Sequence, residues 1–289
     1  MPNISIENGN FLNVQIDGNK ELPKVILSNS LGADTRMWDP QVETLKNKFC
    51  VIRYDKRGHG KSSPVEGPYS FEMLENDVIT ILDELEIEKA HFVGLSIGGM
   101  TSLGLALKHQ KRFNKLICCA ARADMPAPMK ETWDQRINVV KDKGTNGVVD
   151  GSIERWYSDD FNKNSANADI INLSKNMISN TSSNGYIGCC EAIKNLDYLK
   201  ELSTISKEML FISGENDMGA PAMAMEEMSH LTPNSKYVCV PGAAAPGTQT
   251  YLLLGVRCDI SSIAIAGAPM SFSPDMKSIS LLIVDNSFK

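Results

Sequence analysis

Short apolar, β-branched runs alternate along the chain with stretches that carry apolar residues at helical spacing. Most runs from Lys24 onward are almost wholly apolar, which is typical of strands buried on both faces of a parallel sheet. The two runs nearest the N-terminus flank Asn8-Gly9-Asn10 and are predicted to form an antiparallel hairpin. The predicted strands are Asn3–Glu7, Phe11–Ile16, Lys24–Ser28, Cys50–Tyr54, Ala90–Leu95, Leu116–Ala120, Glu208–Ser213 and Tyr237–Val240.

Helices are predicted between these strands. From Phe71 to Leu85 the apolar residues recur at helical spacing, and Ser70 is placed to cap the first turn. Ile97–Lys108 is rich in small and apolar residues, as expected of a helix packed on the centre of a sheet. Pro221–Ser229 begins with a proline, which suits a first helical turn. The alternation predicts an α/β fold with a mostly parallel central sheet.

One stretch interrupts the alternation. Residues 124–195 contain no convincing strand, and helical patterns occur near Lys130–Lys143, Gly151–Trp156, Ile170–Ile178 and Gly188–Lys194. We interpret residues 124–196 as a helical cap inserted into a core that comprises residues 1–123 and 197–245. Residues 246–289 form a tail of different composition, with few charged residues and no glutamate, and their structure is not predicted.

Composition narrows the class of protein. The 289 residues are 42% hydrophobic and 22% charged, with a formal net charge of −6, so a packed core is expected and nucleic acid is a poor partner. No apolar stretch is long enough to span a membrane, and the N-terminus lacks the pattern of a signal peptide. Seven cysteines, including two adjacent pairs, favour reduced thiols and a cytoplasmic location. The oligomeric state is not predicted.

The clearest chemical motif surrounds Ser96. A predicted strand, the sequence Gly94-Leu95-Ser96-Ile97-Gly98 and a predicted helix follow one another, which is the context of a G-x-S-x-G nucleophile elbow. Ser96 is therefore the candidate nucleophile. The backbone N–H of Ile97, at the helix N-terminus, is a candidate donor to the oxyanion of a tetrahedral intermediate.

A second oxyanion donor and an acid are expected at the ends of other strands. The loop after Lys24–Ser28 offers the backbone N–H of Ser30, with Leu31 as the alternative. Asp217 follows the strand Glu208–Ser213 in a glycine-containing turn and is the candidate acid, with Glu215 as its competitor.

These segments together resemble the α/β-hydrolase superfamily, and within it the 3-oxoadipate enol-lactonases. The motifs are L-S-N-S-L-G at 27–32, R-Y-D-K-R-G-H-G-K-S-S at 53–63, G-L-S-I-G-G at 94–99 and S-G-E-N-D at 213–217. The most specific of these motifs is N-S-L-G at residues 29–32, where most members of the superfamily have H-G. The resemblance extends over residues 1 to about 244, cap included.

The resemblance implies an α/β-hydrolase fold that opens a small carboxylate-bearing lactone in the breakdown of aromatic compounds. Ser96 would attack the lactone carbonyl, and Ser30 and Ile97 would hold the oxyanion. It implies a small-molecule substrate and no cofactor. The sequence also lacks H-E-x-x-H and C-x-x-C spacing, so no metal is expected. A carboxylesterase, a carbon–carbon bond hydrolase and an inactive ligand-binding relative remain open alternatives.

One residue departs from the family pattern. The family places its catalytic histidine after the last strand in a P-G-x-x-H sequence, but here Pro241-Gly242-Ala243-Ala244 is followed by Ala245. An alanine side chain cannot accept a proton, so we expect a severely impaired enzyme. The four histidines of the chain, at 59, 91, 109 and 230, are poorly placed in the sequence to replace it.

An anionic lactone requires a cation near the pocket. Arg122 follows the strand Leu116–Ala120 and lies at the carboxyl edge of the predicted sheet. Arg155, in the cap, is a second candidate, and Trp133 is a possible apolar wall. Each has a plainer interpretation as surface charge or cap core.

Overall fold

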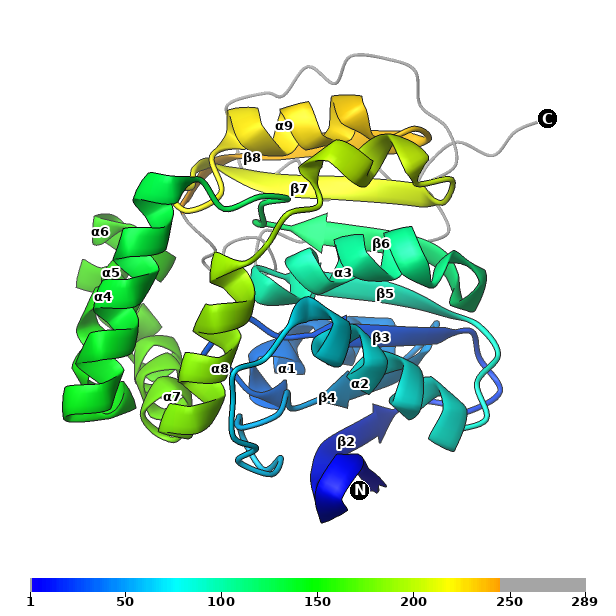
Figure 1. Ribbon diagram of the computed structural model, residues 1–289, viewed down its shortest axis with the longest axis horizontal. Helices are drawn as coiled ribbons and strands as arrows, with labels where there is room; N and C mark the ends of the chain where they lie inside the picture. The colour runs from blue at the N-terminus through cyan, green and yellow to red at the C-terminus, as the bar shows by residue number, and fades with distance from the viewer. Residues whose placement is uncertain (1, 245–289) are drawn as a thin grey trace.

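An eight-stranded sheet lies at the centre of the molecule, in the spatial order β1-β2-β4-β3-β5-β6-β7-β8 (Figure 1). The structure, a computed structural model, describes residues 2–244. Strands β3 to β8 pair in parallel with their neighbours, whereas β2 pairs antiparallel with both β1 and β4. The strands are β1 Asn3–Ser5, β2 Phe11–Asp17, β3 Lys24–Ser28, β4 Cys50–Tyr54, β5 Ala90–Leu95, β6 Phe113–Cys119, β7 Glu208–Asn216 and β8 Ser235–Ala244.

This sheet confirms the predicted fold class, and β3, β4 and β5 have the predicted bounds. The largest difference is at the end of the sheet, where β7 and β8 run several residues beyond their predicted ends. Gly214, Pro241 and Gly242 are poor strand formers, so the pattern does not mark these residues as strand. The pairing of β7 with β8 nevertheless continues as far as Asn216 and Ala244, after a register shift beyond Gly214.

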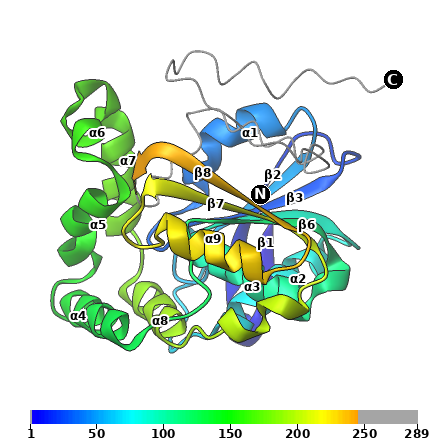
Figure 2. The ribbon, with the colours of Figure 1, turned by 90° about the horizontal axis from the view of Figure 1, so that it is seen from above.

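Helices cover both faces of the sheet. Figure 2 shows α2 (Phe71–Glu84), α3 (Ile97–Lys108) and α9 (Ala222–Leu231) on one face and α1 (Asp39–Leu45) on the other. The hydroxyl of Ser70 accepts a hydrogen bond from the backbone N–H of Met73, as predicted for the cap of α2. Helix α1 was not predicted, because it is short and buries only Val42, which leaves no periodic signal.

The inserted cap is wholly helical and lies beside the carboxyl ends of the parallel strands (Figure 1). Its two connections to the core meet as an isolated antiparallel bridge between Asp124 and Asp197. Within residues 2–244, no helix combines the length and apolarity needed to cross a bilayer. The cap helices are α4 Ala127–Lys143, α5 Val149–Trp156, α6 Asp159–Lys163, α7 Ala168–Ser179 and α8 Ser183–Lys194.

Candidate active site

Ser96 occupies a strained bend between β5 and α3. Its φ of 57° and ψ of −116° lie outside the regions that L-residues normally adopt. The backbone N–H of Ser96 donates to the carbonyl oxygen of Cys119 at 2.9 Å, which fastens the bend to the end of β6. This is the backbone shape of a nucleophile elbow, and it places the side chain at the carboxyl edge of the sheet.

The glycines on either side of Ser96 have no room for a side chain. A Cβ on Gly94 would lie 2.0 Å from the carbonyl oxygen of Gly98, and a Cβ on Gly98 would lie 2.3 Å from that of Ser28. Both clashing atoms belong to the backbone, so no side-chain rotation can relieve the clash. The G-x-S-x-G spacing is therefore a steric requirement of the bend.

Two backbone segments can supply oxyanion donors. Ile97 is the first residue of α3, so its N–H has no acceptor within the helix. In the loop after β3, the N–H of Ser30 is directed at the sulfur of Met37, at a nitrogen–sulfur distance of 3.4 Å. The carbonyl of Ser30 accepts from the N–H of Ala33 at 3.3 Å. A thioether is a weak acceptor, so Ser30 stays a predicted donor, and Leu31 stays the alternative.

Asp217 is a buried carboxylate with one satisfied oxygen. Its Oδ1 accepts from the backbone N–H groups of Gly219 and Ala220, both at 2.8 Å. Its Oδ2 is buried and has no hydrogen-bond partner among residues 2–244. Burial raises the pKa of Asp217 to about 6, against the lowering effect of the two N–H donors. The competitor Glu215 is exposed and accepts instead from the N–H of Gly242 at 2.7 Å.

The end of β8 runs beside the turn that carries the acid. Ala244 pairs with Asn216, which immediately precedes Asp217. The predicted histidine position, Ala245, and the tail 246–289 lie outside the described residues.

Within the part of the chain that the structure describes, none of the four histidines forms a hydrogen bond with Ser96 or Asp217. His59 is buried, its Nδ1 is 3.1 Å from the carbonyl oxygen of Arg57, and burial lowers its pKa to about 4. His91 lies at the start of β5 and contacts the ring of Phe49 edge to face. His109 and His230 lie at the far end of α3 and in the last turn of α9.

The predicted substrate-side residues fall into two places. Arg122 lies just after β6 and is 3.5 Å from the carboxylate of Asp124. The Nε of Arg122 is buried and has no partner among the described residues. Trp133 and Arg155 lie in the cap, on α4 and α5.

Arg155 is a partly buried cation with no carboxylate within 4 Å among residues 2–244. Its guanidinium donates to the hydroxyl of Ser152 at 3.0 Å. Burial, together with the positive charge of Arg136, lowers its pKa to about 10. The guanidinium of Arg136 stacks over the ring of Trp133, 4.2 Å from the ring centre. Two arginines and an aromatic ring therefore gather in the cap.

This group of cap residues adjoins the loop after β3 through Tyr186 of α8. The ring of Tyr186 lies 3.5 Å from where a Cβ on Gly32 would be, and Gly32 has a φ of +76°. Arg136 and Arg155 both act to lower the pKa of the buried Tyr186, although burial raises it to about 12. The cap thus brings positive charge close to the loop that carries Ser30 and Leu31.

Comparison with known proteins agrees with this arrangement. Residues 23–245 match the family model described as the alpha/beta hydrolase fold. The chain belongs to the α/β-hydrolase family. It is 36% identical over 214 residues to 3-oxoadipate enol-lactonase 1 of Acinetobacter baylyi, an alignment that covers 74% of this chain and 79% of that protein.

Solved structures give the same family for this α/β hydrolase. The enol-lactonase from Burkholderia xenovorans LB400 is 33% identical, with a TM-score of 0.82, and the alignment covers 86% of this chain and 95% of that one. A thermophilic esterase from Thermogutta terrifontis, solved with malate bound, is 25% identical with a TM-score of 0.82, covering 91% and 99%. The resemblance to enol-lactonases is therefore confirmed.

Sequence patterns missed three side chains of this α/β hydrolase that belong to the cap group or contact the loop after β3. From the sequence pattern alone, Arg136 is an ordinary exposed charge and Tyr186 an ordinary core aromatic residue. No local pattern shows that α4, α5 and α8 pack together. Lys56 reads as one charge in a polar turn, yet it is buried and donates to the carbonyl oxygen of Asn29. Burial lowers the pKa of Lys56 to about 7, while Asp55 and Cys189 act to raise it.

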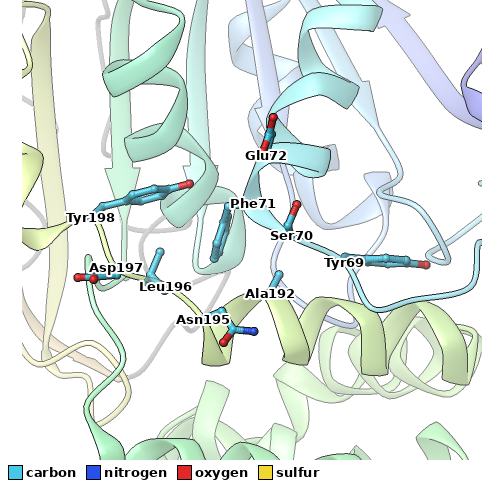
Figure 3. Close-up of a pocket in the computed structure, with 9 residues that line it drawn as sticks. All are labelled: Tyr69, Ser70, Phe71, Glu72, Ala192, Asn195, Leu196, Asp197 and Tyr198. Carbon is cyan, nitrogen blue, oxygen red and sulfur yellow. The ribbon is translucent and has the colours of Figure 1, made fainter.

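A separate pocket of about 190 Å³ lies between the start of α2 and the chain that leaves α8 (Figure 3). It contains none of the predicted site residues. The hydroxyl of Tyr198 donates to the buried carboxylate of Glu75 at 2.5 Å, so this polar group is already satisfied. The pocket is lined by Tyr69, Ser70, Phe71, Glu72, Ala192, Asn195, Leu196, Asp197 and Tyr198.

Proposed function

We propose that this α/β hydrolase is built to open a small carboxylate-bearing lactone of the 3-oxoadipate enol-lactone type, with Ser96 as nucleophile. The observation that carries the proposal is the bend at Ser96, with its φ of 57° and its two obligatory glycines. Such strain persists where the surrounding structure enforces it, and it serves to present a side chain to a ligand.

The reaction would proceed through an acyl-enzyme. As Oγ of Ser96 bonds to the lactone carbonyl carbon, its proton passes to a general base, and the carbonyl oxygen becomes an oxyanion held by Ile97 and by Ser30 or Leu31. The ring C–O bond then breaks, and the departing enol oxygen takes up that proton. Water next adds to the acyl carbon and gives a proton to the base. The bond from the acyl carbon to Oγ then breaks, Oγ takes the proton back, and the dicarboxylate product leaves.

The sequence has no histidine at the position where the family places the base for these steps, since Ala245 stands there. Asp217 would orient an imidazole through Oδ2, which has no partner among residues 2–244. Removing the histidine of a serine-hydrolase triad costs a factor of ~10⁶ in kcat and leaves ~10³–10⁴ over water. We therefore propose a severely impaired enzyme.

The cap supports an anionic substrate. Arg155 is partly buried beside a second arginine, and among residues 2–244 no carboxylate is paired with it. A guanidinium in that state is stabilised when a ligand carboxylate fills the gap. Arg122, whose Nε has no hydrogen-bond partner among residues 2–244, is the alternative cation at the edge of the sheet, and Trp133 is proposed as an apolar wall. The malate bound to the Thermogutta esterase is likewise a carboxylate, which agrees with this substrate class.

Three alternatives stand beside the lactonase, and two of them have specific support. The similarity to the Thermogutta esterase favours a carboxylesterase, and a carbon–carbon bond hydrolase would use the same elbow. Ala245 favours an inactive relative that binds ligand without turning it over. A substrate panel separates the first two from a lactonase, and titration of the unmodified chain with a carboxylate-bearing lactone detects the third.

Restoring the base tests the proposal directly. We expect the Ala245→His variant to hydrolyse a carboxylate-bearing enol-lactone and to react with a fluorophosphonate at Ser96, at rates at least 10³-fold above the unmodified chain. The matched control is Ala245→Asn, whose amide has hydrogen-bonding groups but cannot act as a base. The Ser96→Ala change in the Ala245→His background must abolish both reactions. Equal rates in the His and Asn variants would contradict the proposal.

A further inference from the structure

Lys56 is a buried cation in an unusual setting. It follows β4 within the R-Y-D-K-R-G-H-G turn and is 1% exposed. Its ammonium donates to the carbonyl oxygen of Asn29 and lies 5.8 Å from the centre of the Tyr54 ring. In residues 2–244 no carboxylate lies within 4 Å of it.

Such a group is expensive to bury. An ammonium inside a protein costs several kcal/mol unless charge and hydrogen bonds compensate for the lost water. The neighbouring carboxylate of Asp55 is engaged elsewhere: it accepts from the side-chain amide of Asn13 and from the backbone N–H groups of Thr35 and Lys61. An apolar side chain would fill the same space without this cost. The hydrogen bond from Lys56 to Asn29 is therefore what distinguishes a lysine at this position.

That hydrogen bond acts on the candidate oxyanion loop. The carbonyl of Asn29 and the N–H of Ser30 belong to one peptide unit, and in a trans peptide these two groups point in opposite directions. A donor fixed on the oxygen therefore fixes the direction of the Ser30 N–H. Through the Ser30–Ala33 hydrogen bond, the next peptide and its Leu31 N–H are oriented as well.

The same carbonyl packs against the elbow. A Cβ on Gly98 would lie 3.0 Å from the carbonyl oxygen of Asn29, so Lys56, Asn29 and the start of α3 form a continuous buried contact. The Asn29 side chain is also held, since its amide donates to the carbonyl of Tyr54 at 3.0 Å and its oxygen accepts from the Trp38 indole at 2.8 Å. Among residues 2–244, Lys56 supplies the one hydrogen bond to the carbonyl itself.

We propose that Lys56 is a positioning residue of the oxyanion hole, which it orders by holding the Asn29 carbonyl. The inference rests on the proposed function of the loop. An amine donates whether or not it is protonated, so the restraint holds across neutral pH. Without it, the Asn29 carbonyl loses its hydrogen bond, and the peptide between Asn29 and Ser30 can rotate more readily and turn a carbonyl toward the site. That would weaken the hole without removing any substrate contact.

Lys56→Met tests this, because methionine keeps the length of the side chain and removes the donor. In the Ala245→His background we expect kcat for the lactone to fall ~10–100-fold with KM nearly unchanged, against ~10²–10³ for complete loss of one oxyanion donor. Lys56→Gln, which retains an N–H donor, should recover part of kcat and serves if the methionine variant does not fold. Lys61→Met, an exposed lysine in the same turn, is the matched control.

A second measurement is independent of activity. Here Ala245 is kept and only the lysine is changed. Amide hydrogen exchange at residues 29–33 should be at least tenfold faster in the Lys56→Met variant than in the Lys61→Met variant. Unchanged exchange together with unchanged kcat would overturn the role of Lys56, as would a rise in KM at constant kcat. If Ala245→His itself is inactive while exchange still responds to Lys56, the proposed function fails and the loop restraint stands.

Discussion

Ala244 of β8 pairs in parallel register with Asn216 of β7, so the last described residue of the chain lies next to the residue that precedes Asp217. Asp217 keeps one buried carboxylate oxygen without a partner among residues 2–244. The family places an imidazole after this strand, whereas the sequence here has Ala245 at that position. Asp217 therefore stays the predicted acid, and within residues 2–244 its Oδ2 is buried without a hydrogen-bond partner.

The unpartnered acid predicts how stability depends on pH. The pKa of Asp217 is raised from 3.8 to about 6, so the folded protein holds this proton more strongly than the unfolded chain does. The free energy of unfolding should therefore fall as the pH rises from about 4 to 6, by up to about 3 kcal/mol from this group. Asp217→Asn removes that titration, and urea unfolding at pH 4, 5, 6 and 7 measures it.

Asp77, whose pKa burial also raises to about 6, titrates in both proteins and cancels from the comparison. Parallel stability curves for the original chain and Asp217→Asn would contradict the prediction. In the Ala245→His variant, an imidazolium beside Asp217 should favour the carboxylate and reduce the fall.

Close packing at the elbow predicts that Gly98→Ala is strongly destabilising. The new Cβ would lie 2.3 Å from the carbonyl oxygen and 2.8 Å from the carbonyl carbon of Ser28, and neither backbone atom can rotate away. Overpacking of this kind costs about 1–3 kcal/mol or more. Denaturant unfolding should show a lower midpoint with little change in slope.

Gly151→Ala is the matched control for that change. Gly151 lies within α5, and its nearest neighbour would be the flexible end of Arg155, 3.3 Å from the new Cβ. Because alanine is the better helix former by about 1 kcal/mol, this variant should be as stable as the original or more so. Equal stability of the two alanine variants would refute the steric account of the elbow.

Backbone strain at Ser96 predicts that glycine and alanine at this position differ in their effect on stability. Alanine keeps the steric cost of a φ of 57°, whereas glycine adopts positive φ freely. Ser96→Gly should therefore be more stable than Ser96→Ala by about 1 kcal/mol, after the greater entropy of unfolded glycine is allowed for. Thermal unfolding of both variants measures the difference, and a more stable alanine variant would show that the bend is unstrained.

The cap arginine predicts a selectivity for charge. In the Ala245→His background, Arg155→Met should raise KM for a carboxylate-bearing lactone about 10–100-fold, the worth of one hydrogen bond to a charged group. KM for a neutral p-nitrophenyl ester should change little. Lys175→Met is the control, because Lys175 is a cap cation that already faces the carboxylate of Asp150, at 3.5 Å. A similar rise in KM for both substrates would remove Arg155 from carboxylate recognition.

The sequence by itself determined most of the framework. Apolar runs and helical spacing predict β3 to β5, α2 and α3, because burial on a parallel sheet imposes a local pattern on the residues that form it. The elbow is readable because its glycines are required by contacts within a few residues or with the adjacent strand end. The absence of a histidine at 245 is likewise a fact of sequence.

Tertiary structure alone decided which cap side chains gather beside the loop after β3. Arg136, Arg155 and Tyr186 come from three cap helices, and no local pattern records how those helices pack. The ammonium of Lys56 is buried because the loop that carries Asn29 packs against it. Local spacing reports which face of an element is buried, whereas charge, desolvation and hydrogen bonding depend on partners that are distant in the chain.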